Sequence, residues 1–301
     1  MILSHRLRAA AGNSGGGIVA TNMRYYDWGD TNCWNPNGSN PNYAWALNPD
    51  GTIKDGTQNT SGLWSMQMTQ TYTYSSSYSG HLQLRDYQIS GNNYNPNINK
   101  QSRDDFEIQN IGTDPFAFEF IHSVYLPPPS VSTSPQDFFQ EQSSFYTFTP
   151  SFAMYNIYLA LGYFKTTING FSQWVLGEYG FSGSGSATNN NLSNYTHSAI
   201  ESSPQAFYSN YFNLWEHIVV TREHTGTNGM KFYRNGSLLG EKTNSIDYSF
   251  NTSGYSGGWS RKMYRMQADI GIHRIYNGTA LTATDVANHY AIAKARFTNI
   301  P

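Results

Sequence analysis

The segment between residues 251 and 261 carries side chains suited to holding a sugar. Tyr255 and Trp259 supply planar rings and Arg261 supplies hydrogen-bond donors, within a run rich in Gly, Ser, Asn and Thr. Saccharide sites combine an aromatic platform with a few polar groups that fix the orientation of the ligand. Tyr255, Trp259 and Arg261 are therefore the candidate carbohydrate-binding residues. The alternative is a glycine-rich loop whose Trp259 folds back onto the protein.

Acidic residues offer little support for acid–base chemistry. Asp105 and Glu107 alternate along the chain and would share one face of an extended strand. Glu119 stands alone among phenylalanines. A general acid or base normally works with a partner group within hydrogen-bonding reach. We expect a solvated strand edge for the pair, the polar face of a strand for Glu119, and no catalytic residue.

Oxygen ligands for a metal ion occur only where turns are expected. Asp27, Asp30 and Asn32 form one group, and Asp50 and Asp55 form another. Neither group has the fixed ligand pattern of a calcium-binding loop, and the eight histidines form no pair at zinc-ligand spacing. Turn chemistry explains both groups, so we predict no metal ion and no cofactor.

Composition restricts the class of protein. Charged residues make up 13% of the 301 positions and the net charge is −2, which argues against phosphate-neutralising nucleic-acid binding and against a polybasic membrane anchor. No run approaches the about 20 apolar residues of a membrane helix, and we expect no secretory signal in the N-terminal segment. Aromatic residues reach 16%, which predicts an ordered chain with tyrosine-rich surfaces. The single cysteine, Cys33, excludes an internal disulfide and is interpreted as an inert thiol.

β-Strands must position the candidate residues. A run of β-branched and aromatic residues predicts a strand at 215–222, and another apolar run predicts one at 266–276. Asn235-Gly236 predicts a hairpin within 230–239, because a type I′ turn needs φ > 0 at both central positions. Alternating polar and apolar residues predict one half-exposed strand over 63–74.

The two ends of the chain carry different signals. Thr282 and Asp285 predict a capping box at the start of a short helix. Apolar residues line one face of this helix at helical spacing: Val286, Tyr290, Ala293 and Phe297. Residues 1–17 contain a short apolar and basic segment before a glycine-rich hinge, with the candidate docking residues Ile2, Leu3, Arg6, Leu7 and Arg8. This segment is either a frayed terminus or an arm that docks onto a neighbouring subunit.

Several motifs occur in order between residues 104 and 297. They are Asp105-Phe106-Glu107-Ile108 followed by Phe116-Ala117-Phe118-Glu119-Phe120, Trp215-Glu216-His217-Ile218-Val219-Val220-Thr221-Arg222, Phe232-Tyr233-Arg234-Asn235-Gly236, Gly271-Ile272-His273-Arg274-Ile275-Tyr276-Asn277, Leu281-Thr282 and Asp285-Val286. Together they resemble a laminin-G-like domain of the concanavalin A-like lectin/glucanase superfamily. The resemblance implies an all-β, antiparallel jelly-roll sandwich with a short C-terminal helix, in which His217 and His273 are structural.

This resemblance also sets the expected domain organisation. The laminin-G-like jelly roll would occupy residues 96–301. Residues 18–95 would form a turn- and aromatic-rich region packed on the sandwich, and residues 1–17 an extended docking arm. Glucanases on this fold carry Glu-x-Asp-x-x-Glu on one strand, and that motif is absent from the chain.

Domain type, low charge and the absence of a recognisable signal together resemble bacteriophage virion proteins, such as decoration proteins, fibres and adhesins. We expect a non-enzymatic structural protein of a virion surface, made in the host cytoplasm and displaying a lectin-like jelly roll. Its expected partners are capsid or tail proteins, its own copies in a homo-oligomer, and a host surface glycan, but neither nucleic acid nor membrane. The alternatives are a carbohydrate-binding receptor adhesin, on a tail fibre or a cell surface, and a divergent glycoside hydrolase.

Overall fold

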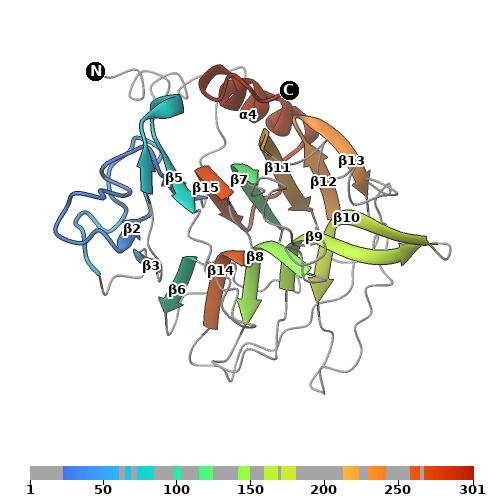
Figure 1. The fold of residues 1–301 in the computed structure, drawn as a ribbon, viewed down its shortest axis with the longest axis horizontal. Coiled ribbons are helices and arrows are strands. Elements are labelled where there is room, and N and C mark those ends of the chain that lie inside the picture. Colours follow the sequence, from blue (N-terminus) through green and yellow to red (C-terminus); the bar gives the residue numbers. More distant parts are fainter. Residues whose placement is uncertain are drawn as a thin grey trace, which may run out of the picture.

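The computed structural model is a sandwich of two antiparallel β-sheets with one C-terminal helix (Figure 1). This confirms the predicted fold class. The residues that the structure describes are 23–60, 65–68, 73–84, 98–102, 115–124, 142–149, 159–168, 171–180, 213–223, 230–241, 258–264 and 268–301. The docking residues at positions 2–8 and the acidic pair Asp105 and Glu107 lie outside them. None of the described helices is long and apolar enough to cross a membrane.

The eight-stranded sheet contains most of the motif residues. Across the sheet the strands are β13 (Ser237–Glu241), β12 (Met230–Arg234), β11 (Trp215–Arg222), β7 (Phe116–Val124), β15 (Ala268–Asn277), β5 (His81–Leu84) and β4 (Thr73–Ser75). The eighth strand, β1 (Met23–Asp27), also pairs with β15. β1 pairs with residues Ile272 to Tyr276 of β15, whereas β5 pairs with residues Ala268 to Ile270 of the same strand. A short 3-10 helix, η1 (Ser77–Ser79), lies between β4 and β5.

The seven-stranded sheet forms the second layer (Figure 1). Its strands are, in order, β10 (Phe171–Gly180), β9 (Leu159–Ile168), β8 (Gln142–Thr149), β14 (Gly258–Tyr264), β6 (Ile98–Ser102), β3 (Ser65–Met68) and β2 (Tyr43–Trp45). Strands from before residue 95 therefore belong to both sheets and pair with strands from the rest of the chain.

The hairpin predicted within residues 230–239 is present in the structure. Asn235 and Gly236 connect β12 to β13 with φ values of 49° and 79°, which are the positive angles that a type I′ turn requires. The Asn235 side chain also accepts a hydrogen bond from the His217 amide at 3.0 Å. The turn is thereby fixed to the neighbouring strand β11 as well as to its own two strands.

The prediction of a single strand over residues 63–74 is wrong. The segment contributes β3 to the seven-stranded sheet and β4 to the eight-stranded sheet. Alternation of polar and apolar residues describes any strand with one buried face. It therefore fits two short strands as well as one long strand, and cannot show where the chain crosses between sheets.

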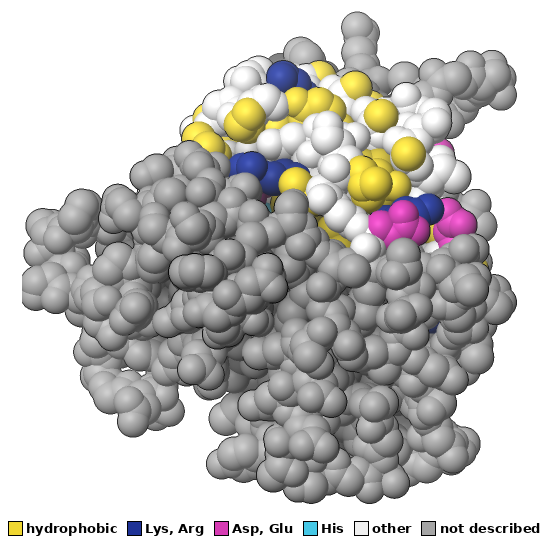
Figure 2. Space-filling model, turned by 90° about the vertical axis from the view of Figure 1, so that its right-hand side faces the viewer, with side chains coloured by type: hydrophobic (Ala, Val, Ile, Leu, Met, Phe, Trp, Pro, Cys, Tyr) yellow, Lys and Arg dark blue, Asp and Glu magenta, His cyan; other side chains and the backbone are white. Residues whose placement is uncertain are grey.

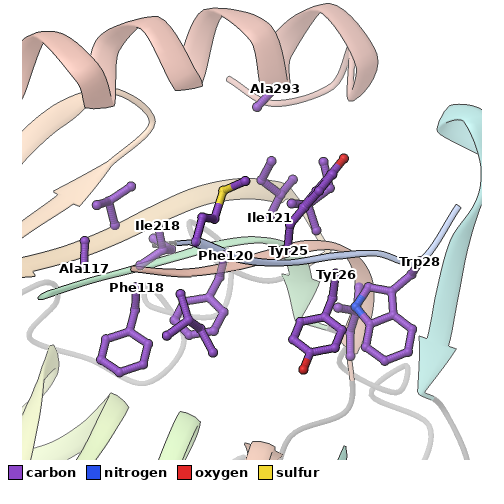
Figure 3. Packing of buried hydrophobic residues seen from close by; sticks show 14 of the residues in the cluster. Tyr25, Tyr26, Trp28, Ala117, Phe118, Phe120, Ile121, Ile218 and Ala293 are labelled. Atoms are coloured by element: carbon purple, nitrogen blue, oxygen red, sulfur yellow. The ribbon is translucent and has the colours of Figure 1, made fainter. Parts of the chain in front are cut away.

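Both faces of the central strands of the eight-stranded sheet are buried. Phe118, Phe120, Tyr26 and Trp28 point to one side of it, whereas Ala117, Ile121 and Tyr25 are on the side of the helix (Figure 3). The strand β11 is buried along its whole length. Apolar residues on both faces of β11 and β15 fit such a sheet. The polar and charged residues of these strands, such as His217 and Arg274, are buried with them.

Helix α4 (Ala283–Arg296) covers one face of this sheet (Figures 1 and 3). Thr282 and Asp285 form the predicted capping box. At the other end, Arg296 donates to both carboxylate oxygens of Asp27 at 2.9–3.0 Å, and to the carbonyls of Tyr78 and Gly80 at 2.8 Å. On the outer surface near the helix, hydrophobic side chains are interspersed with polar and charged ones (Figure 2).

The phenyl ring of Phe297 closes the end of α4 against the sheet. It lies 4.4 Å from the Trp215 ring and 5.9 Å from the Tyr78 ring, measured between centroids. Gly271 of β15 leaves room for it, because a Cβ atom there would lie 2.3 Å from Phe297 Cζ. The glycine is therefore required for close packing between the helix end and the strand.

Candidate functional site

Trp259 and Arg261 lie in β14, which is a strand of the seven-stranded sheet and not the loop that composition suggested. Tyr255 falls outside the described residues. β14 pairs with β8 on one side and β6 on the other. Because alternate residues of a strand share a face, Trp259 and Arg261 occupy the same face of this sheet.

Strand register places polar residues beside both candidates. Trp259 pairs with Gln101 of β6 and Thr149 of β8, and Arg261 pairs with Asn99 and Thr147. Directly paired residues of neighbouring antiparallel strands share a face. Two rows of amide and hydroxyl residues are therefore centred on the tryptophan and the arginine.

The row through Arg261 continues across the whole sheet. Its register partners form what we call the Arg261 row: Tyr43, Gln67, Asn99, Arg261, Thr147, Ala160 and Tyr179. At one end of this row, the Tyr43 ring stacks at 6.5 Å on the ring of the buried Trp45. The row thus combines aromatic ends with a polar centre.

The opposite face of the same sheet is more apolar. Its register row through Lys262 consists of Met68, Ile98, Lys262, Tyr146, Leu161 and Glu178, and the pair of Ala44 and Met66 lies in the next row on this face. Ala44 is fully buried and belongs to the hydrophobic core. Trp45, which shares the face of Tyr43, is also buried. Both faces of the sheet therefore contain buried side chains at β2, and Arg261 and Lys262 lie on opposite faces.

A second polar centre lies beneath helix α4, around Glu119. Its Oε1 atom accepts from His217 Nε2 at 3.0 Å and from Arg274 Nη1 at 2.5 Å. Its Oε2 atom accepts from Tyr276 Oη at 3.2 Å and from His289 Nδ1 at 3.0 Å. Glu119, His217 and His289 have fully buried side chains. The expectation of a polar strand face for Glu119 is wrong, because α4 covers that face.

The electrostatics of Glu119 follow from these contacts. Burial raises the pKa of this carboxyl group, but the charge of Arg274 and the interactions with His289 and His217 outweigh burial. The pKa of Glu119 therefore stays well below its ordinary value. A carboxylate accepts about four hydrogen bonds, so the four donors satisfy Glu119 in its ionised form. The arrangement is suited to joining a helix to a sheet, and its carboxylate has no access to solvent.

The acidic residues that were considered as metal ligands make local contacts. Asp27 accepts from Tyr25 Oη at 2.8 Å and from the Gly29 amide at 3.0 Å, besides its ion pair with Arg296. Asp30 accepts from the Asn32 amide, and Asp50 accepts from the amide and hydroxyl of Thr52. These are the turn contacts that short acidic side chains make. Within the described parts of the chain, no group of three or more His, Cys, Asp or Glu residues is arranged to hold a metal ion.

Comparison with known proteins gives structural neighbours only. No family model and no curated protein matches the chain. Domain 4 of AbnA, an extracellular arabinanase from Geobacillus stearothermophilus solved with arabinotriose, is 12% identical, with a TM-score of 0.46 over 91% of this chain and all of that one. The ligand-binding domain of botulinum neurotoxin serotype D, solved with N-acetylneuraminic acid, is 12% identical, with a TM-score of 0.43 over 95% of this chain and 52% of that one.

The receptor-binding domain of botulinum neurotoxin type G is 14% identical, with a TM-score of 0.38 over 90% of this chain. The chain spans about half the length of both neurotoxin domains, at 51% and 52%. Similarity at this level assigns neither a family nor a ligand to the protein.

Proposed function

We propose that this protein is a non-enzymatic, lectin-like surface protein that binds a glycan on the face of the seven-stranded sheet that carries Trp259 and Arg261. The observation that carries the proposal is the Arg261 row. Its polar centre lies between aromatic ends, and the neighbouring row adds Trp259 between Gln101 and Thr149. Sugars offer hydroxyl groups to amides and apolar ring faces to aromatic side chains.

The size of this face suits an oligosaccharide. Seven strands at about 4.8 Å spacing give the Arg261 row a length of about 29 Å. A site on regular strands is also more rigid than a site on a loop, which limits the conformational entropy lost on binding. Several weak polar contacts along such a row can therefore add up to useful affinity.

Substitution of Trp259 or Arg261 tests the glycan site. We expect Trp259→Ala and Arg261→Ala each to weaken binding of a glycan, first identified on an array, by about tenfold or more, since one lost stacking or charge-assisted contact of about 1.4 kcal/mol has that effect. The measurement is calorimetric titration, with circular dichroism to show that each variant folds.

Lys262→Ala is the matched control, because this cation is adjacent in β14 but on the opposite face. The Lys262→Ala variant should bind the glycan with the same affinity as the unmodified protein. Equal losses for Arg261→Ala and Lys262→Ala, or no loss for Trp259→Ala, would remove this face as the binding site.

The proposal places the protein on the surface of a phage virion, attached through its N-terminal region as a decoration or fibre component. Low charge and abundant tyrosine support this setting, because contacts between virion subunits bury area that is apolar and hydrogen-bonded. The basic and apolar segment at residues 2–8 supplies the proposed contact.

Removal of residues 1–17 tests the attachment. We expect the shortened chain to fold with an unchanged far-ultraviolet spectrum and to lose incorporation into particles, measured as its copy number per purified virion. An Arg6→Gln/Arg8→Gln variant separates charge from apolar contact, and should incorporate partially. Full incorporation of the shortened chain would refute attachment through this segment.

A hydrolase remains the competing function, and one observation opposes it. Glu119, a carboxylate within the motif residues, has four donors and no solvent exposure, whereas a general acid must reach its substrate. Cleavage of a bound polysaccharide that disappears in Glu107→Gln would overturn the non-enzymatic proposal.

A further inference from the structure

The Glu119 centre connects a helix to a sheet through side chains that can take up protons. Glu119 belongs to β7, His217 to β11, Arg274 and Tyr276 to β15, and His289 to α4. His289 is thus the member that α4 contributes, and its Nδ1–H bond to Glu119 is a buried polar link between the helix and the sheet.

Helix α4 is also what shields His217. The His217 ring stacks on Tyr290 of α4 at 6.2 Å, and its side chain has no solvent exposure. Movement of α4 away from the sheet would expose both His217 and His289 to water. The protonation of His217 is therefore coupled to the position of the helix.

The charge balance of the centre disfavours a further proton while the helix is docked. One carboxylate, Glu119, already faces one guanidinium, Arg274. The groups that face this centre from the surrounding elements are Tyr25 and Asp27 of β1, Glu119 of β7, His217 of β11, Arg274 and Tyr276 of β15, and Asp285, His289 and Tyr290 of α4. An added proton leaves a net positive charge in a site that water does not reach.

We propose that α4 is held by an acid-sensitive latch, in which proton uptake by His217 at mildly acidic pH releases the helix from Glu119 and from the eight-stranded sheet. The docked form disfavours protonated His217 through burial and through the nearby charge of Arg274, and the released form does not. Phe297 and Arg296 hold the other end of the helix, so the latch acts on the part that carries His289.

The direction of the pH effect follows from proton linkage. Burial lowers the pKa of His217 in the docked form, and the hydrogen bond that His217 donates to Glu119 only partly opposes this. The released form regains an ordinary pKa of about 6.5 and so binds more protons below that pH. The docked form therefore loses stability as the pH falls below about 6.5. Below about 4.5 Glu119 adds to this loss, because its docked pKa is also lowered.

Hydrogen exchange of the full chain tests the latch. Protection factors of the amides of α4 and of β11, corrected for intrinsic exchange, are compared between pH 7.5 and pH 5. We expect protection of α4 to fall by up to about tenfold per pH unit below about pH 6.5, the limit for one coupled proton. Protection of β11 should change much less, and a hydrophobic dye should bind as the apolar face of α4 becomes exposed.

Two variants separate the latch from general acid sensitivity. His217→Gln places an amide donor near the Nε2 position and takes up no proton, so the response of α4 should vanish. His122→Gln is the control, since His122 is buried on the other face of the sheet, beside Phe120, and the response of α4 should persist. If α4 and β11 lose protection equally, if α4 shows no response, or if His217→Gln retains the response, the latch does not exist.

Discussion

Replacing Glu119 by glutamine should lower the free energy of unfolding at neutral pH by about 3–5 kcal/mol, as expected when one partner of a buried ion pair is removed. Arg274 would remain charged and buried without its carboxylate. The new amide group would also turn a donor toward donors that now meet an acceptor, such as His289 Nδ1 or Tyr276 Oη. Urea unfolding followed by circular dichroism measures the loss.

Glu223→Gln is the matched control for this substitution. Glu223 pairs with Lys231 at 3.2 Å, but its side chain is 47% exposed. Solvent-exposed ion pairs contribute little, so we expect a loss below about 1 kcal/mol. Similar losses for the two variants would mean that the Glu119 centre is no more important than an ordinary surface pair.

Phe297→Ala should destabilise the fold by about 3–5 kcal/mol, the usual effect of removing a buried aromatic ring from a core. The ring is fully buried between Trp215, Tyr78 and the backbone at Gly271. Thermal and urea unfolding of the full chain would both report this change. The variant should retain β-sheet content, since the sheets themselves keep their hydrogen bonds.

A double-mutant cycle tests the reason for this effect. Gly271→Ala alone should destabilise the protein by about 1–3 kcal/mol, because the new methyl group would overlap the Phe297 ring. In the Phe297→Ala background the same change should be much less harmful, since the ring that it meets is gone. Additive effects of the two substitutions would show that Gly271 is needed for another reason.

Features that depend on a few neighbouring residues could be predicted from the sequence. The hairpin turn at Asn235, the strand β11 and the capping box at Thr282 all appear where the local pattern placed them. Each depends on backbone angles or hydrogen bonds within a few positions of the chain. The two-sheet architecture was implied by the resemblance to a laminin-G-like domain that several such motifs carry together.

The Glu119 centre could not be predicted, because its members are distant in the chain. Glu119 lies 98 positions from His217, 155 from Arg274, 157 from Tyr276 and 170 from His289. The local pattern of β7 shows an acidic residue opposite a phenylalanine face. It contains no sign that a helix from the end of the chain covers that acidic residue.

The face that we propose for glycan binding contains two residues singled out from the sequence. Trp259 and Arg261 were identified by residue type, but glycine and serine content suggested a loop where the structure has β14. The neighbours Asn99, Gln101, Thr147 and Thr149 were missed. They come from two other strands, and only the register of the sheet places them beside the candidates.

The position of β15 has a consequence for the synthesis of the protein. This strand pairs with β7 on one side and with β1 and β5 on the other, so it lies between segments that leave the ribosome much earlier. Until residue 277 has emerged, β7 and β1 each expose an unpaired edge, and edges of this kind recruit other chains. The nascent chain should therefore depend on chaperones until its last strand is made, and a truncation before residue 268 should aggregate.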